Sequence, residues 1–199
     1  MSPRSSFAEA ARTRERIVRA AIAEASRIGL DSLTIGSLAD RLSMSKAGVI
    51  GPFGSRENLQ QAALEQASHI FRTAVLTPLA DLPPGALRLS RLIDAWIAYL
   101  ADCPFPGGCF VTSTSTEFDG RPGPIRDHLR ATVFSWRTLL TTEITAAQAE
   151  SPAPHRPADE IATTLIGISM SINQEIQLLN DDSAPQRGRS AMRHAAGLP

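Results

Sequence analysis

Apolar side chains recur every three or four residues along most of the chain, which is the period of an amphipathic α-helix. Residues 12–28 show this period clearly, and Gly29 follows them as a left-handed helix C-cap. The same period predicts further helices at residues 35–42, 46–51, 56–76, 86–101, 125–149, 159–179 and 185–196. Proline-rich segments at 77–85 and 151–157 predict loops between them.

One stretch, residues 102–124, is ambiguous. Its Thr and Ser side chains suit the surface of a strand, yet residues 107–119 also fit a short helix within a helical body. We favour the helix, because no partner strand is visible elsewhere in the sequence and an isolated strand is not stable. The sequence therefore predicts an all-α protein of about nine helices, with strands nearly absent.

Two short helices near the N-terminus have the dimensions of a helix-turn-helix, in which the second helix enters the major groove of DNA. Thr34 precedes the first as its N-cap, residues 43–45 form the turn, and Pro52 stops the second. Ala39 permits close approach of the two helices, and Val49 is spaced to pack against the first. A plain helical hairpin in the core of a bundle is the alternative interpretation of this pattern.

The distribution of charge favours DNA binding. The chain carries 20 basic and 20 acidic residues, but residues 1–60 hold nine basic against six acidic groups, so a basic head precedes an acidic body. The outward residues Ser45, Ala47, Gly48 and Gly51 are small, which lets the helix backbone approach DNA. Ser45 and Lys46 are suited to bind phosphate there.

Several other classes of function are disfavoured. The first thirty residues contain six arginines and no uninterrupted apolar stretch, so we expect no signal peptide, and no apolar run reaches the roughly 20 residues of a membrane-spanning helix. We therefore expect a cytoplasmic protein with no membrane partner. Scattered histidines and a six-residue step from Cys103 to Cys109 predict no metal site, and we expect no cofactor. The sequence contains no G-x-G-x-x-G, G-x-S-x-G or H-E-x-x-H motif, so we expect no enzyme.

Residues 12–71 resemble the N-terminal domain of the TetR/AcrR transcriptional regulators, with GLDSLTIGSLADRLSMSKAGVIGPFGSRENL between two helices. The matching residues are Gly29, Thr34, Leu38, Ala39, Ser45, Lys46, Phe53, Ser55, Glu57 and Leu59. The later motifs GGCFV and EFDGRPGP and an apolar penultimate helix are similar to one ligand-domain branch of that family. The resemblance implies a helix-turn-helix DNA-binding domain at residues 1–54 and a ligand-binding and dimerisation domain at 55–199. It also implies a repressor that a small-molecule inducer releases from a palindromic operator on double-stranded DNA.

The chain departs from the family pattern around the second short helix. Ser43 stands where the family commonly has Gly, so a left-handed backbone there would cost about 1 kcal/mol. The family's Tyr and basic or His positions fall on Ile50, Gly51 and Pro52, so direct phosphate contacts are fewer. Ile50 is suited instead to touch a thymine methyl group. The candidate DNA-binding residues are Thr34, Ser45, Lys46, Ala47, Gly48, Ile50, Gly51 and Arg56.

The resemblance also implies a ligand cavity walled by the fourth to eighth helices. Seven of the ten aromatic residues lie between positions 96 and 136 with polar side chains among them, as in a mostly apolar pocket. For any single aromatic, an ordinary core position is the alternative. No Arg or Lys occurs from position 92 to 120, so we expect a neutral or cationic, apolar effector. The candidate ligand-binding residues are Trp96, Tyr99, Phe105, Cys109, Phe110, Thr112, Ser113 and Phe134.

The penultimate helix, with IATTLIGISMSINQEIQLL, keeps a stripe of small and apolar side chains. A helix buried within a monomer would show the same stripe. The family resemblance favours a homodimer whose two-fold interface combines this helix with residues 185–196. The candidate interface residues are Leu165, Ser169, Ile172 and Ile176.

Two rival functions would use the cysteines. A thiol redox enzyme would need Cys103 and Cys109, but neither begins a C-x-x-C motif. A regulator that senses oxidants or electrophiles would show thiol reactivity linked to loss of DNA binding. Otherwise each cysteine is a small buried hydrophobic residue.

Overall fold

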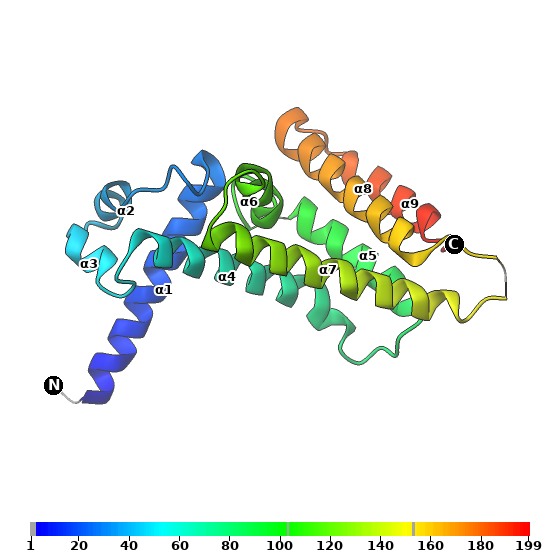
Figure 1. Cartoon of the computed structure of the whole chain (residues 1–199), viewed down its shortest axis with the longest axis horizontal. Coiled ribbons are helices and arrows are strands. Elements are labelled where there is room, and N and C mark those ends of the chain that lie inside the picture. The colour runs from blue at the N-terminus through cyan, green and yellow to red at the C-terminus, as the bar shows by residue number, and fades with distance from the viewer. Residues whose placement is uncertain (1–2, 103, 153) are drawn as a thin grey trace. The chain divides into compact units, whose positions relative to one another are not determined.

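This computed structural model describes residues 3–102, 104–152 and 154–199, with side chains from Phe7 onward. Helices make up all of the regular secondary structure of these residues (Figure 1). The helices are α1 (Pro3–Ile28), α2 (Ile35–Leu42), α3 (Lys46–Ile50), α4 (Arg56–Leu76), the 3₁₀ turn η1 (Thr77–Leu79), α5 (Ala86–Ala101), α6 (Phe110–Phe118), α7 (Pro124–Gln148), α8 (Ala158–Leu179) and α9 (Ala184–Ala195). The nine α-helices of these residues confirm the predicted all-α fold. α6 also confirms that the ambiguous stretch contains a helix.

α1 begins earlier than the hydrophobic period predicts, at Pro3 rather than near residue 12. Residues 7–12 are all exposed, so no buried face marks this part of the helix. Its alanines, Ala8, Ala10 and Ala11, favour helix by intrinsic propensity, and proline is tolerated in a first turn. Local propensity therefore extends α1 beyond the segment that packing stabilises.

The predicted Thr34 and Gly29 caps are present, and other helix ends are capped as well. Thr34 Oγ1 accepts the Ser37 N–H at 3.1 Å at the start of α2, and Ser55 Oγ accepts the Asn58 N–H at 3.0 Å at the start of α4. Gly29, with φ 87°, follows α1 in the left-handed conformation, and Ser43, with φ 52°, follows α2 in the same conformation. The turn after α2 is therefore left-handed at Ser43, and such a residue carries about 1 kcal/mol of strain.

The helices pack into two compact units. Unit 1 contains the chain up to His69 together with Phe105–Leu129, and unit 2 contains Ile70–Pro104 and Arg130–Pro199. α4 and α7 each contribute one part to each unit, whereas α6 lies wholly in unit 1, where it packs with α1. The core of unit 1 includes the fully buried side chains Ile17, Ile22, Leu33, Leu38, Leu59 and Phe110.

A carboxylate from α6 fixes the end of α1. Glu117 Oε2 accepts the Leu30 N–H at 2.8 Å, and Glu117 Oε1 accepts the Asp31 N–H at 2.8 Å. Gly29 leaves room for this group, because a Cβ there would lie 2.9 Å from Glu117 Oε1. Arg121, just beyond α6, pairs with the Asp31 carboxylate at 2.6 Å. Hydrogen bonds to a charged acceptor are stronger than neutral ones, so Glu117 holds the α1–α2 loop firmly.

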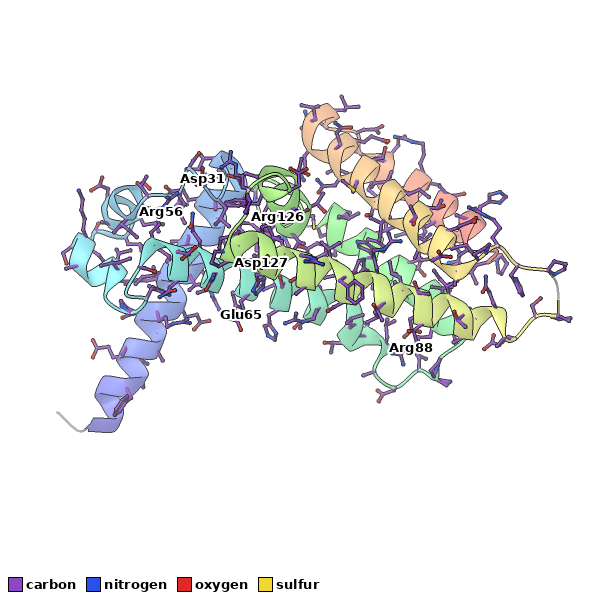
Figure 2. The ribbon with its side chains drawn as sticks, in the orientation of Figure 1. Asp31, Arg56, Glu65, Arg88, Arg126 and Asp127 are labelled. Atoms are coloured by element: carbon purple, nitrogen blue, oxygen red, sulfur yellow. The ribbon has the colours of Figure 1, made fainter. Side chains whose placement is uncertain are left out.

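α4 holds the same loop through its first two turns. Arg56 donates from Nε to the Leu33 carbonyl at 2.7 Å and from Nη2 to the Asp31 carbonyl, and Asp31 and Arg56 lie together in Figure 2. Gln60, which is buried, donates from Nε2 to the Leu30 carbonyl at 2.7 Å. The loop before α2 is therefore held by side chains from two other helices.

In unit 2, α8 and α9 lie side by side (Figure 1), and α9 also packs on α5. Gly188 on α9 permits the close approach, because a Cβ there would lie 2.6 Å from Ile172 Cγ1 and 3.1 Å from Ile97 Cδ1. The short distance between α8 and α9 therefore depends on the absence of a side chain at Gly188.

The turn between α8 and α9 is held by a charged cluster. Asp181 Oδ1 accepts from the Ser183 hydroxyl at 2.6 Å and from its N–H at 2.8 Å, and Oδ2 lies 2.7 Å from Arg187. The Ser183 hydroxyl first, and then Arg187, lower the pKa of Asp181 from 3.8 to about 2. Because the folded pKa is lowered, the stabilisation by this carboxylate is present above the ordinary pKa and is lost as the pH falls toward 2.

The loop before α6 packs directly on α1, since a Cβ at Gly107 would lie 1.6 Å from the Ser26 carbonyl oxygen. We therefore expect Gly107→Ala to separate these segments and to lower the free energy of unfolding by about 2 kcal/mol, the size of an overpacking change. Gly120→Ala is the matched control, because a Cβ there meets nothing within 4 Å. Urea unfolding followed by circular dichroism measures both variants, and equal midpoints would contradict the tight packing.

Candidate functional site

α2 and α3 form the predicted helix-turn-helix within unit 1, with residues 43–45 between them (Figure 1). Leu38 and Ala39 on α2 and Val49 on α3 are buried, which confirms that these positions join the two helices. Phe53 is buried after α3, and the guanidinium of Arg14 lies 5.0 Å from the centre of its ring. The hairpin is therefore fixed by its own apolar contact and by α1.

The other side of α3 carries small residues and one cation. Lys46 is exposed and makes no ion pair within the described residues. Ser45 Oγ accepts the Gly48 N–H at 3.0 Å as the N-cap of α3, which leaves the hydroxyl proton to donate to another group. The exposed or partly exposed candidates here are Ser45, Lys46, Ala47, Gly48, Ile50 and Gly51.

Two other candidate DNA-binding residues have partners within the protein. The Thr34 hydroxyl caps α2, as expected for an N-cap. The Arg56 guanidinium binds the carbonyls of Leu33 and Asp31, 23 and 25 residues away along the chain. Such distant partners are not visible in the sequence, and they make Arg56 a positioning group for the loop before α2.

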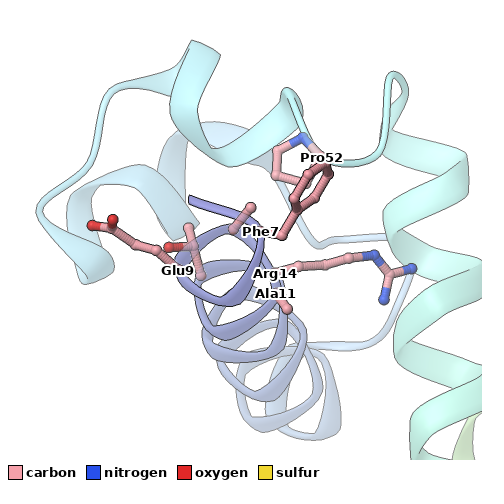
Figure 3. Close-up of a pocket in the computed structure, with 7 residues that line it drawn as sticks. Phe7, Glu9, Ala11, Arg14 and Pro52 are labelled. Atoms are coloured by element: carbon pink, nitrogen blue, oxygen red, sulfur yellow. The ribbon is translucent and has the colours of Figure 1, made fainter. Parts of the chain in front are cut away.

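Sequence reasoning missed a second basic element, which is the exposed face of α1 that carries Arg12, Arg16 and Arg19. Arg16 Nη2 lies 3.2 Å from the Met44 sulfur in the helix-turn-helix turn, and Arg12, one turn earlier, is exposed. The signal was available, because positions 12, 16 and 19 share one helix face. An open pocket of about 620 Å³ lies along this part of α1 (Figure 3), lined by Phe7, Glu9, Ala10, Ala11, Thr13, Arg14 and Pro52.

Unit 2 contains a cluster of four aromatic rings from α4, α5 and α7. Trp96 and Tyr99 of α5 are 4% and 6% exposed, while Phe71 and Trp136 are partly exposed. Phe71 meets Tyr99 at 5.0 Å and Trp136 at 4.9 Å between ring centres, and Trp96 meets Trp136 at 4.9 Å. Trp96 and Tyr99 are predicted ligand-binding residues that the structure brings together. Phe71 and Trp136 also belong to the cluster, although they were not among the predicted ligand-binding residues.

The remaining candidate ligand-binding residues lie elsewhere. Phe105, Cys109, Phe110, Thr112 and Ser113 belong to unit 1, and Phe105 and Phe110 pack on each other at 5.9 Å. The Ser113 hydroxyl donates to main-chain carbonyls of its own segment, and Thr112 is partly exposed. Phe134 is 70% exposed, so it is not part of the core of unit 2.

The cysteines and other reactive groups add no further site. Cys109 is buried, which disfavours a reactive thiol, and Cys103 lies outside the described residues. Among the described residues no group of three or more His, Cys, Asp or Glu side chains is placed to hold a metal ion. No helix in the described ranges is long and apolar enough to cross a membrane.

The predicted dimer stripe on α8 packs inside its own protomer. Leu165, Ser169 and Ile172 are buried, with Ile172 only 4% exposed against Gly188, and Ile176 is partly exposed. This placement has a simple physical reason, because the apolar face of α8 covers α5 and α9. The opposite face of α8 includes the exposed residues Thr163, Gly167, Met170, Gln174 and Leu178.

Known proteins share this arrangement of helices. A TetR transcriptional regulator from Chloroflexus aurantiacus J-10-FL is 24% identical, with a TM-score of 0.83 over 95% of this chain and 94% of that one. A regulator from Saccharomonospora viridis, solved in complex with choline, is 19% identical, with a TM-score of 0.78 over 92% and 95% of the two chains. AibR, solved with isovaleryl coenzyme A and operator DNA, is 16% identical, with a TM-score of 0.76 over 94% and 97%. A comparison with curated proteins gives no match.

The amino-acid sequence also matches a protein family directly. Residues 85–192, more than half of the chain, match the family described as "Tetracyclin repressor-like, C-terminal domain". The helix-turn-helix, the nine helices of the described residues and the shared fold agree with that match. The chain therefore belongs to the TetR family of DNA-binding transcriptional regulators.

Proposed function

We propose that the protein is a homodimeric repressor that binds a near-palindromic operator and is released from it by a small-molecule effector. The observation that carries the proposal is α3, whose exposed side holds one cation and small residues beside a buried helix-turn-helix contact. Small outward groups allow the helix backbone to lie close to the base edges of the major groove.

The DNA contacts divide into two kinds. Lys46 and the Ser45 hydroxyl bind phosphate, and Arg12 and Arg16 on α1 extend this basic surface. Ile50 contacts a thymine methyl group, which reads sequence without a hydrogen bond. Ala47, Gly48 and Gly51 let the backbone approach, and Thr34 and Arg56 position α2 and its loop.

A second copy of the chain supplies the partner for the exposed face of α8. Met170 and Leu178 are 46% and 69% exposed and lie on that face beside Gly167, where a Cβ would meet nothing within 4 Å. Helices with small and apolar exposed residues pack closely in two-fold bundles. A two-fold dimer also places two α3 helices for half-sites about 34 to 36 Å apart.

The effector is a neutral or cationic, apolar small molecule that binds at the aromatic cluster of unit 2. Support comes from the buried aromatic rings and from the absence of Arg and Lys on α5 after Arg91. Proteins of the same fold have been solved with choline and with isovaleryl coenzyme A, so the fold admits chemically different ligands. The dimer has one state that fits the operator and one that does not. The effector binds the second state more tightly than the first, and it therefore shifts the population away from operator binding.

Lys46→Ala should weaken binding to operator and random DNA alike, because phosphate contacts carry no sequence information. Each phosphate contact contributes about −0.9 to the slope of log K against log salt, so the slope should flatten by about one unit. Arg156→Ala is the control, because Arg156 belongs to unit 2 rather than to the unit that contains the helix-turn-helix, and it is paired with Glu160 at 3.6 Å. Fluorescence anisotropy at several salt concentrations measures both slopes, and an unchanged slope for Lys46→Ala would remove it from the phosphate contacts.

Met170→Asp should raise the dimer dissociation constant by about a hundredfold or more, because it buries an unpaired carboxylate twice per dimer. Leu87→Asp is the matched control, since Leu87 is a large exposed apolar residue on α5 rather than α8. Sedimentation velocity at micromolar concentration reports the state of each protein. A Met170→Asp variant that remains dimeric would place the interface on another surface.

Operator DNA should weaken effector binding by the same factor by which the effector weakens operator binding, because linkage is reciprocal. The measurement is a calorimetric titration of a compound that releases the operator, with and without operator DNA present. Equal effector affinities in the two titrations would show that the compound does not act through the proposed population shift.

A further inference from the structure

The four rings of the aromatic cluster, Phe71, Trp96, Tyr99 and Trp136, meet at nearly right angles. The interplanar angles are 84° for Phe71–Tyr99, 80° for Phe71–Trp136 and 86° for Trp96–Trp136. In an edge-to-face pair, the positive edge of one ring lies against the negative face of the other. The cluster therefore contains several ring faces whose attraction for positive charge is satisfied only by the edges of neighbouring rings.

An organic cation would satisfy those faces better than ring edges do. A cation near an aromatic face is attracted by the ring quadrupole, most strongly by tryptophan, and the attraction increases where water is excluded. Two of the four rings are tryptophans, and Trp96 and Tyr99 are almost completely buried. Phe71 and Trp136 are partly exposed, so these two rings form the side that solvent can reach.

The indole nitrogen of Trp136 gives an independent indication. Trp136 Nε1 is buried and has no hydrogen-bond partner in the described part of the chain. Buried N–H donors are almost always paired in native proteins, and leaving one unpaired costs free energy. An oxygen acceptor on a ligand held between the rings would pair this donor.

The charges of unit 2 suit a cationic ligand better than an anionic one. Arg137 follows Trp136 but donates to the Thr163 hydroxyl at 3.0 Å. Arg88, which Figure 2 labels, is paired with the buried Glu143 at 3.0 Å. Nearer the C-terminus of α5 no basic residue occurs at all. Arg91, the other basic residue of α5, is exposed and lies five residues before Trp96, about 140° away around the helix, so its side chain points away from that ring.

We propose that the aromatic cluster of Phe71, Trp96, Tyr99 and Trp136 is a binding site for a small organic ammonium compound that carries an oxygen acceptor. The rings surround the ammonium group, and Trp136 Nε1 donates to the oxygen. The proposal rests on the function proposed above, because it names the chemical class of the effector. Binding moves the Phe71 and Trp136 rings apart, since their centres are 4.9 Å apart in this structure.

The two tryptophans of the chain both lie in the cluster, so intrinsic fluorescence reports on it directly. The full-length protein is titrated with choline, with its uncharged carbon isostere 3,3-dimethylbutan-1-ol, and with tetramethylammonium, which lacks the oxygen. We expect choline to bind about tenfold or more tightly than the isostere, from the cation–π attraction. We expect choline to bind about three- to tenfold more tightly than tetramethylammonium, from the single hydrogen bond.

Two variants separate the two contributions. Trp136→Phe keeps an aromatic face but removes the N–H, so it should abolish the preference for choline over tetramethylammonium while Trp96 still reports binding. Phe71→Leu removes one ring face and should weaken both cations while leaving the isostere unchanged. Far-ultraviolet circular dichroism shows whether each variant is folded, and Phe134→Leu, at an exposed ring outside the cluster, is the control.

The outcomes distinguish this proposal from the proposed function. Equal affinity for choline and its isostere, or no binding of any ammonium probe to the folded protein, would overturn the ammonium site. Operator binding by the same preparation is measured separately, without any ammonium compound. A protein that binds no operator under this condition would instead contradict the repressor proposal. Choline binding that leaves operator affinity unchanged would support the site and overturn its assignment as the effector site.

Discussion

The two hydrogen bonds from the Leu30 and Asp31 backbone to Glu117 are the constraint on which the geometry of unit 1 depends. They join the end of α1 to α6, which lies more than eighty residues further along the chain. Arg56 and Gln60 bind the carbonyls of the same loop from α4. The loop leads directly into α2, so the direction in which the helix-turn-helix leaves α1 is set by side chains outside it.

Most of the fold could be predicted because it follows from local chemistry. The helical period locates the apolar faces. Thr34 and Ser55 begin helices by accepting backbone N–H groups, and Gly29 ends one. The left-handed turn at Ser43 could be inferred as well, from the resemblance to a family that has Gly there. These features depend on residues within a few positions of each other.

Features that depend on distant partners could not be predicted. A hydrophobic stripe indicates that a helix face is buried, but it does not indicate which element covers that face. The stripe that contains Ile172 was therefore compatible with a dimer interface and also with packing against α9. In the same way, an arginine at the start of α4 suited phosphate, whereas Arg56 binds carbonyls of an earlier loop. The aromatic cluster was predicted only in part, because Phe71 on α4 and Trp136 on α7 are both distant in sequence from Trp96 and Tyr99 on α5.

The membership of α6 in unit 1 has a consequence for protein engineering within this family. To change operator specificity, one would exchange the DNA-binding segment for that of a relative, and a continuous N-terminal fragment would be the simplest piece to exchange. In this protein such a fragment would leave behind Glu117 and Arg121, together with the backbone at Gly107 that packs on α1. The transferable module is therefore discontinuous, and a chimera must carry the stretch around α6 with the N-terminal helices, or redesign the loop that receives it.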